Sequence, residues 1–191
     1  ISDPNTPLEE TLGALDLIVR RGKALYVGIS SYSAEMTKQA SIILKKLGTP
    51  CLIHQPHYNM FDRSFENGLK QVLEEEGIGS IAFCPLAQGL LTPKYLSGIP
   101  SDSRVSKKAG FITKEDVLGD KLNKVKQLQK VASNRGQSIN QMALSWALRS
   151  NHLTSVLIGA SKVGQITENI HALDNLEWSS EELKTIDTIL G

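Results

Sequence analysis

Four short, almost uninterrupted apolar runs recur along the chain and alternate with segments of helical periodicity. The runs lie at about residues 24–30, 51–55, 79–84 and 154–160. Strands this short and this apolar are buried on both faces, which requires a parallel sheet covered by helices. The alternation predicts the α/β class, with a single domain over residues 1–191. An open four-stranded sheet and half of an eight-stranded barrel satisfy this pattern equally.

The helical segments between these runs carry end signals. Thr6 is expected to be the N-cap of the first helix, with Pro7 at its first position. Ser33 is expected to cap the second helix and Gly48 to close it. Ser179 is expected to cap the last helix. These signals place a helix next to each strand.

Composition argues against several classes of protein. A net charge of +1 gives no support for nucleic acid or a membrane surface as a partner. No run reaches the roughly 18 apolar residues that span a bilayer, and no signal segment precedes the first helix, so we expect a cytoplasmic protein.

Cys51 and Cys84 lie in strand-like runs and are predicted to be reduced core thiols. His54 and His57 lack a third ligand candidate, so no metal site is expected.

Residues that follow the strands are the first candidates for a binding site, because ligands of parallel α/β proteins bind at the carboxyl ends of strands. These positions read "GISSYS", "HQPHYN", "CPLAQGLL" and "GASK". Hydroxyls at Ser30 and Ser31 suit a ligand amide, or fill a turn. Gln55 ends an apolar run and needs a hydrogen-bond partner, which is either a ligand or a neighbouring loop.

The "GASK" segment suits a phosphate group. Gly159 permits close approach of the backbone, and Ser161 is expected to cap the helix that follows. The free N–H groups at the start of that helix and the charge of Lys162 then favour an anion. An ordinary capped helix fits the same residues. The sequence has no GxGxxG motif, so it gives no support for an open dinucleotide-binding fold.

The segment from Thr92 to Val117 is long and polar for a connection inside a compact domain. Its basic residues are Lys94, Arg104, Lys107 and Lys108. It follows the third strand, so it emerges at the same end as the candidate binding residues. A lid over an anionic ligand and a solvated loop are the two interpretations.

Four motifs together resemble a known family. "LYVGISSYS", "IHQPHYN", "FCPLAQGLLTPKY" and "SVLIGASKVGQITENI", in this order and spacing, are similar to the second half of an aldo-keto reductase. The similarity is to the bacterial group related to potassium-channel β subunits and glyceraldehyde-3-phosphate reductases. It implies the C-terminal half of a (β/α)8 barrel with four parallel strands, and extended NADPH bound at the carboxyl ends of the strands without a Rossmann fold. Simple aldehydes or ketones, including methylglyoxal and glyceraldehyde phosphate, are the implied substrates.

The resemblance implies roles for the residues at the nicotinamide end of the cofactor. Ser30 and Gln55 would hold the carboxamide, with Ser31 at a position where relatives commonly have Asn or Arg. Phe83 would stack on the nicotinamide, where relatives usually have Trp or Tyr. The residues implied beside the pyrophosphate are Cys84, Pro85, Leu86, Ala87 and Gln88, with Lys94 and Arg104 as basic lid residues.

A second group would hold the adenosine end. Its members are Gly159, Ser161, Lys162, Gln165, Glu168 and Asn169. Ser161 and Lys162 would meet the 2′-phosphate, and the last three residues would face the adenine and ribose. Lys162 stands where Arg is common in the family. It keeps the charge that favours NADPH over NADH, but it cannot stack flat on adenine as a guanidinium can.

The resemblance assigns no catalytic residue. The family's proton donor is a Tyr held by an Asp, a Lys and a His, and all four come from the first four strands of the barrel. We therefore expect the cofactor-binding half of an NADPH-dependent aldo-keto reductase. A non-catalytic nucleotide-binding or regulatory half-barrel, and a structural domain without a ligand, are the alternatives.

The length of the chain raises a further question. It begins at Ile1 without a methionine, so a fragment and a natural half-length protein are both considered. Four strand–helix units leave open sheet edges, whose backbone groups need partners. A natural half-length protein is therefore predicted to be a homo-oligomer, a dimer in which two halves pair.

Overall fold

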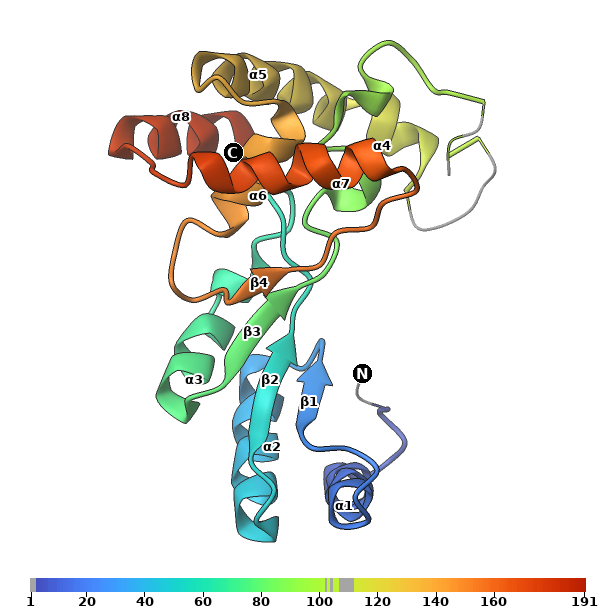
Figure 1. Cartoon of the computed structure of the whole chain (residues 1–191), viewed down its shortest axis with the longest axis vertical. Coiled ribbons are helices and arrows are strands. Elements are labelled where there is room, and N and C mark those ends of the chain that lie inside the picture. The colour runs from blue at the N-terminus through green and yellow to red at the C-terminus, as the bar shows by residue number, and fades with distance from the viewer. Residues whose placement is uncertain (1–2, 102, 104, 107–111) are drawn as a thin grey trace. The chain divides into compact units, whose positions relative to one another are not determined.

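The chain divides into two compact units in the computed structural model, which describes residues 3–101, 103, 105–106 and 112–191 (Figure 1). The sheet unit comprises Ile1–Tyr58, Asp62–Phe83 and Ser150–Leu157. The helical unit comprises Asn59–Phe61, Cys84–Arg149 and Ile158–Gly191.

Four parallel strands form the centre of the sheet unit. They are β1 (Val27–Ser30), β2 (Cys51–Gln55), β3 (Gly79–Ala82) and β4 (Ser155–Val156), adjacent in that order. The predicted parallel sheet is confirmed, but its outer strands are shorter than expected. Leu25 and Tyr26 precede β1 and are 83% and 68% exposed, because they lie outside the hydrogen-bonded ladder.

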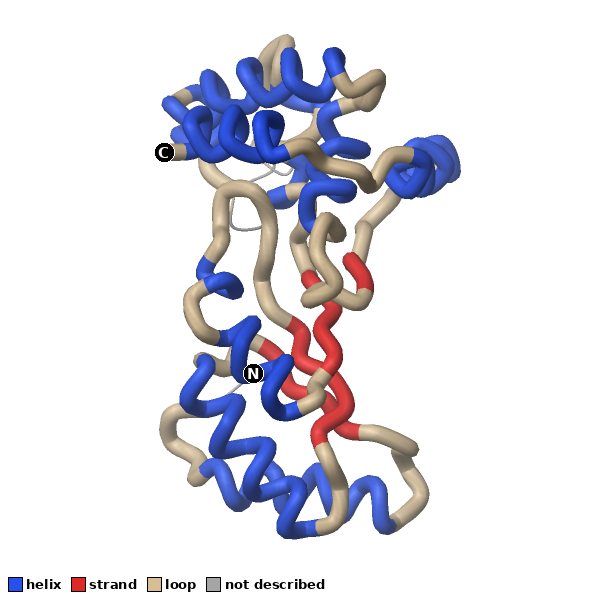
Figure 2. The backbone as a smooth tube through the Cα atoms, turned by 90° about the vertical axis from the view of Figure 1, so that its left-hand side faces the viewer, coloured by secondary structure: helices blue, strands red, loops and turns tan. Residues whose placement is uncertain are grey.

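Among the described residues, the helices that accompany the sheet are α1 (Leu8–Arg20), α2 (Ala34–Leu47), the short η1 (Ser64–Glu66) and α3 (Leu69–Glu76). α2 packs against both α1 and α3, and in Figure 2 these helices are seen beside the strands. The expected ends of α2 are confirmed, since the Ser33 hydroxyl accepts from the Met36 N–H at 3.2 Å and Gly48 has φ +82°. The predicted cap of α1 is wrong. Pro7 is its N-cap residue, and the Thr6 hydroxyl donates to Asp3 instead.

The two faces of the sheet are buried to different degrees. Ile29, His54 and Ser80 are register neighbours on one face and are at most 6% exposed. Ile53 and Gln55, on the alternate face of β2, are only half-buried. The expectation that both faces are buried therefore holds only around Ile29, His54 and Ser80. The other face carries Ser30 and Gln55, which pair in register.

Helices make up the other unit: η2 (Ala87–Gly89), η3 (Pro93–Tyr95), α4 (Lys114–Leu118), α5 (Asp120–Asn134), α6 (Ile139–Ala147), α7 (Val163–Ile170), η4 (His171–Asp174) and α8 (Ser180–Leu190). α6 is central, with Met142, Ala143 and Trp146 at most 1% exposed, and it packs against α5, α7 and η4. The predicted Ser179 cap of α8 is confirmed by a 3.1 Å bond from the Glu182 N–H. Across the described residues, no helix combines the length and apolarity that crossing a membrane requires.

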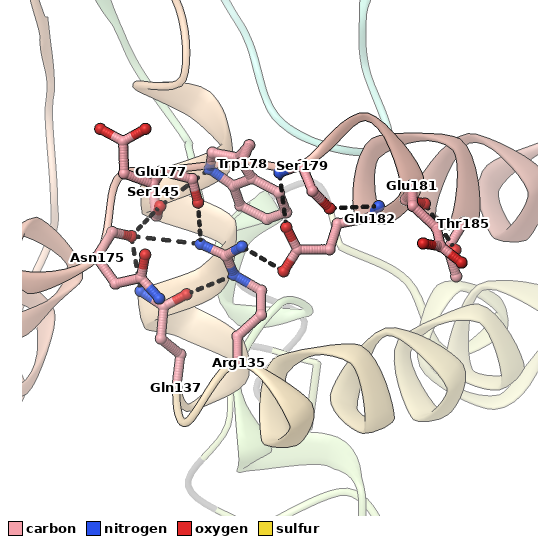
Figure 3. A network of polar contacts seen from close by, with 10 residues as sticks. All are labelled: Arg135, Gln137, Ser145, Asn175, Glu177, Trp178, Ser179, Glu181, Glu182 and Thr185. Carbon is pink, nitrogen blue, oxygen red and sulfur yellow. Dashed lines mark hydrogen bonds and ion pairs between the residues drawn. The ribbon is translucent and has the colours of Figure 1, made fainter.

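An arginine joins α5 to the segment before α8 (Figure 3). The guanidinium of Arg135 donates to Glu182 Oε1 at 2.6 Å and to the Glu177 carbonyl at 2.9 Å. It also donates to Gln137 Oε1 at 2.9 Å and lies 3.7 Å from the centroid of the Trp178 ring. Its side chain is 3% exposed, so this is an enclosed ion pair with directional partners.

Candidate functional site

The carboxyl ends of β1 and β2 bring three predicted residues together. The Ser30 hydroxyl donates to the Gln55 carbonyl at 3.0 Å, and the Ser31 N–H donates to the same oxygen at 3.1 Å. Ser31 is exposed and has φ 58°, in the left-handed region that non-glycine residues seldom occupy. The Gln55 side-chain amide has no hydrogen-bond partner among the described residues. The alternative that a neighbouring loop binds this amide is therefore not supported within that part of the chain.

Phe83 extends the β2–β3 ladder beyond the end of β3. Its N–H donates to the Pro56 carbonyl at 3.0 Å, and it forms an isolated parallel bridge with His57. The two rings lie 5.0 Å apart between centroids and are inclined by 55°. The Phe83 ring is half-buried, so an aromatic surface remains available at this strand end.

The structure adds an aspartate that sequence reasoning missed. Nδ1 of His57 lies 2.6 Å from Asp62 Oδ2. Burial raises the pKa of Asp62, but hydrogen bonds from Ser64 and His57 outweigh burial and hold the pKa below its usual value. The ionised carboxylate only accepts, so Nδ1 of His57 carries the proton. The five-residue spacing crosses an irregular turn, and no periodic pattern could have revealed the pair.

The segment after β3 has a strained backbone where the pyrophosphate residues were predicted. Cys84, Ala87 and Gln88 have φ values of 54°, 46° and 56°. The Cys84 carbonyl accepts from Asn59 Nδ2 at 3.2 Å and from the Ala87 N–H at 3.0 Å, which fixes the turn. Leu86 and Gln88 are half-buried and Pro85 is buried. Left-handed non-glycine residues of this kind concentrate at ligand sites.

The two cysteines differ. Cys51 is buried in β2, and burial raises the pKa of its thiol, as expected of a core residue. Cys84 is only half-buried, so the prediction of a core thiol is wrong for this residue. The reason is that β3 ends at Ala82, and Cys84 lies in the turn beyond it.

The start of α7 differs in detail from the prediction. The helix begins at Val163, so Lys162 rather than Ser161 is its N-cap residue. Gln165 Oε1 accepts from the Ser161 N–H at 2.8 Å and from the Lys162 N–H at 3.2 Å. The predicted residues that are exposed here are Gly159, Ser161, Lys162, Gln165 and Glu168. This end of α7 therefore presents a lysine and a hydroxyl to solvent.

Asn169 was expected to face the adenine, but it is 7% exposed. Its Oδ1 accepts from Asn140 Nδ2 of α6 at 2.9 Å.

Lys94 is exposed, and its Nζ lies 5.8 Å from the centroid of the Tyr95 ring. Arg104, Lys107 and Lys108 lie outside the described residues. The structure therefore places one of the basic lid residues and gives no geometry for the others.

Metal-ligating residues do not gather in the part of the chain that the structure describes. Within that part, no three His, Cys, Asp or Glu side chains lie together as ion ligands. The candidate groups of the sheet unit are therefore hydroxyls, an amide and an aromatic ring, and those of the helical unit are backbone groups, a hydroxyl and a lysine. These groups suit an organic ligand with amide and phosphate functions.

Comparison with known proteins defines the class. Residues 1–190 match the aldo/keto reductase family, and the chain belongs to this family. It is 51% identical over 189 residues to an L-glyceraldehyde 3-phosphate reductase of Escherichia coli K12, covering 97% of this chain and 55% of that protein. It is 36% identical over 185 residues to a probable voltage-gated potassium channel subunit β of Oryza sativa subsp. japonica, covering 95% and 56%. The chain thus spans about half the length of these relatives.

A solved structure supports the same classification. The chain is similar to a thermostable aldo-keto reductase crystallised with the inhibitor epalrestat, with 26% identity and a TM-score of 0.71. The similarity covers 98% of this chain and 56% of the other. The predicted α/β architecture, half of an aldo-keto reductase barrel with four parallel strands, is therefore confirmed.

Proposed function

We propose that this chain is the cofactor-binding half of an NADPH-dependent reductase of aldehydes and ketones. The observation that carries the proposal is the end of β2. Gln55 is half-buried there, and its amide is unpartnered among the described residues. Beside it, the Ser30 hydroxyl donates a hydrogen bond to the backbone carbonyl of Gln55. The chain belongs to the aldo/keto reductase family, and the unpaired side-chain amide of Gln55 is a suitable hydrogen-bond partner for the carboxamide of nicotinamide.

The residues present fit the nicotinamide end of NADPH. Gln55 offers both a donor and an acceptor to the carboxamide, and the hydroxyls of Ser30 and Ser31 offer further bonds. The half-buried ring of Phe83 provides a stacking surface. NADPH supplies the hydride when it is bound, and these residues bind and orient its ring.

The residues of the helical unit fit the other end of the cofactor. The left-handed turn at Cys84, Ala87 and Gln88 holds backbone groups in a fixed, strained arrangement that suits pyrophosphate. At the start of α7, Ser161 and Lys162 are exposed and suit the 2′-phosphate. The charge of Lys162 is the feature that favours NADPH over NADH.

Cofactor preference tests this proposal. Fluorescence titration of the 191-residue chain with NADPH and with NADH should show tighter binding of NADPH. Lys162→Ala should weaken NADPH about tenfold and leave NADH nearly unchanged, because about 1.4 kcal/mol of a charge-assisted contact is lost only with the 2′-phosphate. Lys184→Ala, an exposed lysine of α8, is the matched control and should change neither affinity. Equal loss for both cofactors would contradict the role of Lys162.

Activity provides a second arm of the test. We propose that the proton-donor set of the family is not carried by this chain. NADPH oxidation with methylglyoxal should therefore show no sustained turnover by the 191-residue chain alone. Sustained turnover would show that the chain supplies its own proton donor.

A further inference from the structure

An aromatic contact beyond the ends of β2 and β3 includes a residue that has no role in the proposed function. His57 lies against Phe83, with the ring centroids 5.0 Å apart and the ring planes inclined by 55°. Tilted ring pairs at this separation are favourable, because the positive edge of one ring meets the negative face of the other. Both residues are half-buried and belong to the sheet unit, so their contact lies within one compact unit.

The backbone of this pair is fixed without help from the side chains. The Phe83 N–H donates to the Pro56 carbonyl at 3.0 Å, and the Phe83 carbonyl accepts from the Tyr58 N–H at 3.4 Å. These bonds hold the main chain of Phe83, but its side-chain torsions can still occupy several staggered wells. Within the described residues, His57 is the aromatic side chain that pairs with the Phe83 ring. The orientation of that ring therefore depends on His57.

The imidazole of His57 is held in its turn by Asp62. Nδ1 of His57 lies 2.6 Å from Asp62 Oδ2. The other carboxylate oxygen, Oδ1, accepts from the Ser64 N–H at 3.1 Å and from the Ser64 hydroxyl at 2.7 Å. Because the two oxygens serve different donors, the plane of the carboxylate is fixed, and with it the ring that donates to Oδ2. The contacts thus continue from Asp62 through His57 to Phe83.

We propose that His57 is a positioning residue, which holds the Phe83 ring in the orientation that stacks on the cofactor nicotinamide, and that Asp62 fixes His57 in this role. This inference rests on the proposed function and concerns the nicotinamide end alone. His57 acts through Phe83 and does not touch the cofactor. A ring that is held before binding loses little side-chain freedom when the ligand arrives, so affinity increases without a new contact.

Two probes test this role. NADPH carries the nicotinamide, whereas adenosine 2′,5′-bisphosphate carries only the adenosine and its phosphates. In calorimetric titrations, His57→Ala should weaken NADPH about fivefold, which is a typical cost of ordering one freed side chain on binding. It should leave the affinity for adenosine 2′,5′-bisphosphate unchanged. A purely structural contact would not distinguish the two probes.

Two further variants separate the ring of His57 from its anchor. His57→Asn keeps an N–H donor toward Asp62 but removes the ring, so it should weaken NADPH as much as His57→Ala. Asp62→Ala keeps the ring but removes its anchor, and should weaken NADPH about threefold. In a His57→Ala background, Asp62→Ala should have no further effect on NADPH affinity, because the two residues act as one unit.

A second histidine–aspartate pair is the matched control. Nδ1 of His171 lies 2.8 Å from Asp174 Oδ2, and the His171 side chain is 58% exposed. Within the described residues, no aromatic ring pairs with His171. His171→Ala removes the same kind of ion pair and should change the affinity for neither probe.

The outcomes distinguish the two proposals. Absence of NADPH binding by the wild-type chain would overturn the proposed function and this inference with it. NADPH binding that is unchanged in His57→Ala would overturn only the positioning role, and so would an equal weakening of both probes. A further loss from Asp62→Ala in the His57→Ala background would overturn the part assigned to Asp62. Should His57→Ala lose its native circular dichroism, the same two titrations of His57→Asn decide.

Discussion

At the residue scale, His54 shows how burial fixes a protonation state. The ring lies in β2 with no exposed surface, between Ile29 and Ser80 in the sheet register. Burial lowers its pKa to about 4, because the charged imidazolium loses hydration there. His54 is therefore neutral in the folded chain at any pH well above 4.

Acid should destabilise the sheet unit through this residue. An unfolded histidine takes a proton near its ordinary pKa of 6.5, whereas folded His54 resists protonation until about pH 4. Its contribution is complete above pH 6.5 and is lost as the pH falls from 6.5 to about 4. Between pH 7.5 and pH 5 the loss should be about 2 kcal/mol of the free energy of unfolding, measured by urea denaturation.

His54→Leu should remove this part of the pH dependence of the free energy of unfolding, because it fills the same buried position with an apolar side chain that does not titrate. His171→Gln is the matched control, since the His171 side chain is 58% exposed. It should retain the wild-type difference between the two pH values. An identical loss of stability in wild type and His54→Leu would show that another group is responsible.

At the scale of elements, Arg135 anchors the segment that leads into α8. The side chain donates to Glu182, to Gln137 and to the backbone of Glu177. A backbone hydrogen bond from Ser179, with a further contribution from Arg135, holds the pKa of Glu182 below its usual value. α8 is therefore fixed by directional polar contacts as well as by its apolar face.

Arg135→Ala should cost roughly 3 kcal/mol of unfolding free energy, because it removes an enclosed charge from three partners. Arg135→Lys keeps the charge but loses the planar fork and its stacking on Trp178, so it should recover only part of that loss. Urea unfolding followed by tryptophan fluorescence measures both variants. Full stability of Arg135→Lys would indicate that charge alone is sufficient.

Much of this element structure was predictable from local patterns. Ser33 and Ser179 cap the starts of helices and Gly48 closes one, as their residue types suggest. Capping is predictable because it depends on neighbours within one turn. The start of α7 was not predictable, since the helix begins one residue later than a Ser161 cap implies, and the Gln165 side chain accepts from the Ser161 and Lys162 N–H groups. The bond between Asn140 and Asn169 joins residues 29 positions apart and leaves no local signature. Long-range polar pairing of this kind requires coordinates.

At the scale of the whole molecule, the sheet has two open edges. β1 and β4 each pair on one side only within the described residues. Large apolar side chains are also exposed on α7 and η4, with Val163 at 79%, Ile170 at 55% and Leu173 at 57%. An apolar helix face and unpaired strand edges both call for a partner.

We propose that a second copy is this partner when the 191-residue chain is produced alone. β1 of one copy would pair with β4 of the other, because parallel strands in this order can continue into an eight-stranded barrel. Light scattering should report twice the monomer mass of 20.9 kDa. Leu25→Lys, at an exposed position just before β1, should shift the mass toward the monomer, whereas Lys184→Ala should not. A monodisperse wild-type monomer would contradict this proposal.

The side chain of Gln165 has a consequence for how an anion binds to the Ser161 and Lys162 N–H groups before α7. Its oxygen already occupies the N–H groups of Ser161 and Lys162. Binding there is therefore an exchange reaction, in which a phosphate oxygen replaces an amide oxygen on the same donors. The number of hydrogen bonds at the backbone is unchanged by such an exchange, so the net free energy comes from the difference between a charged and a neutral acceptor.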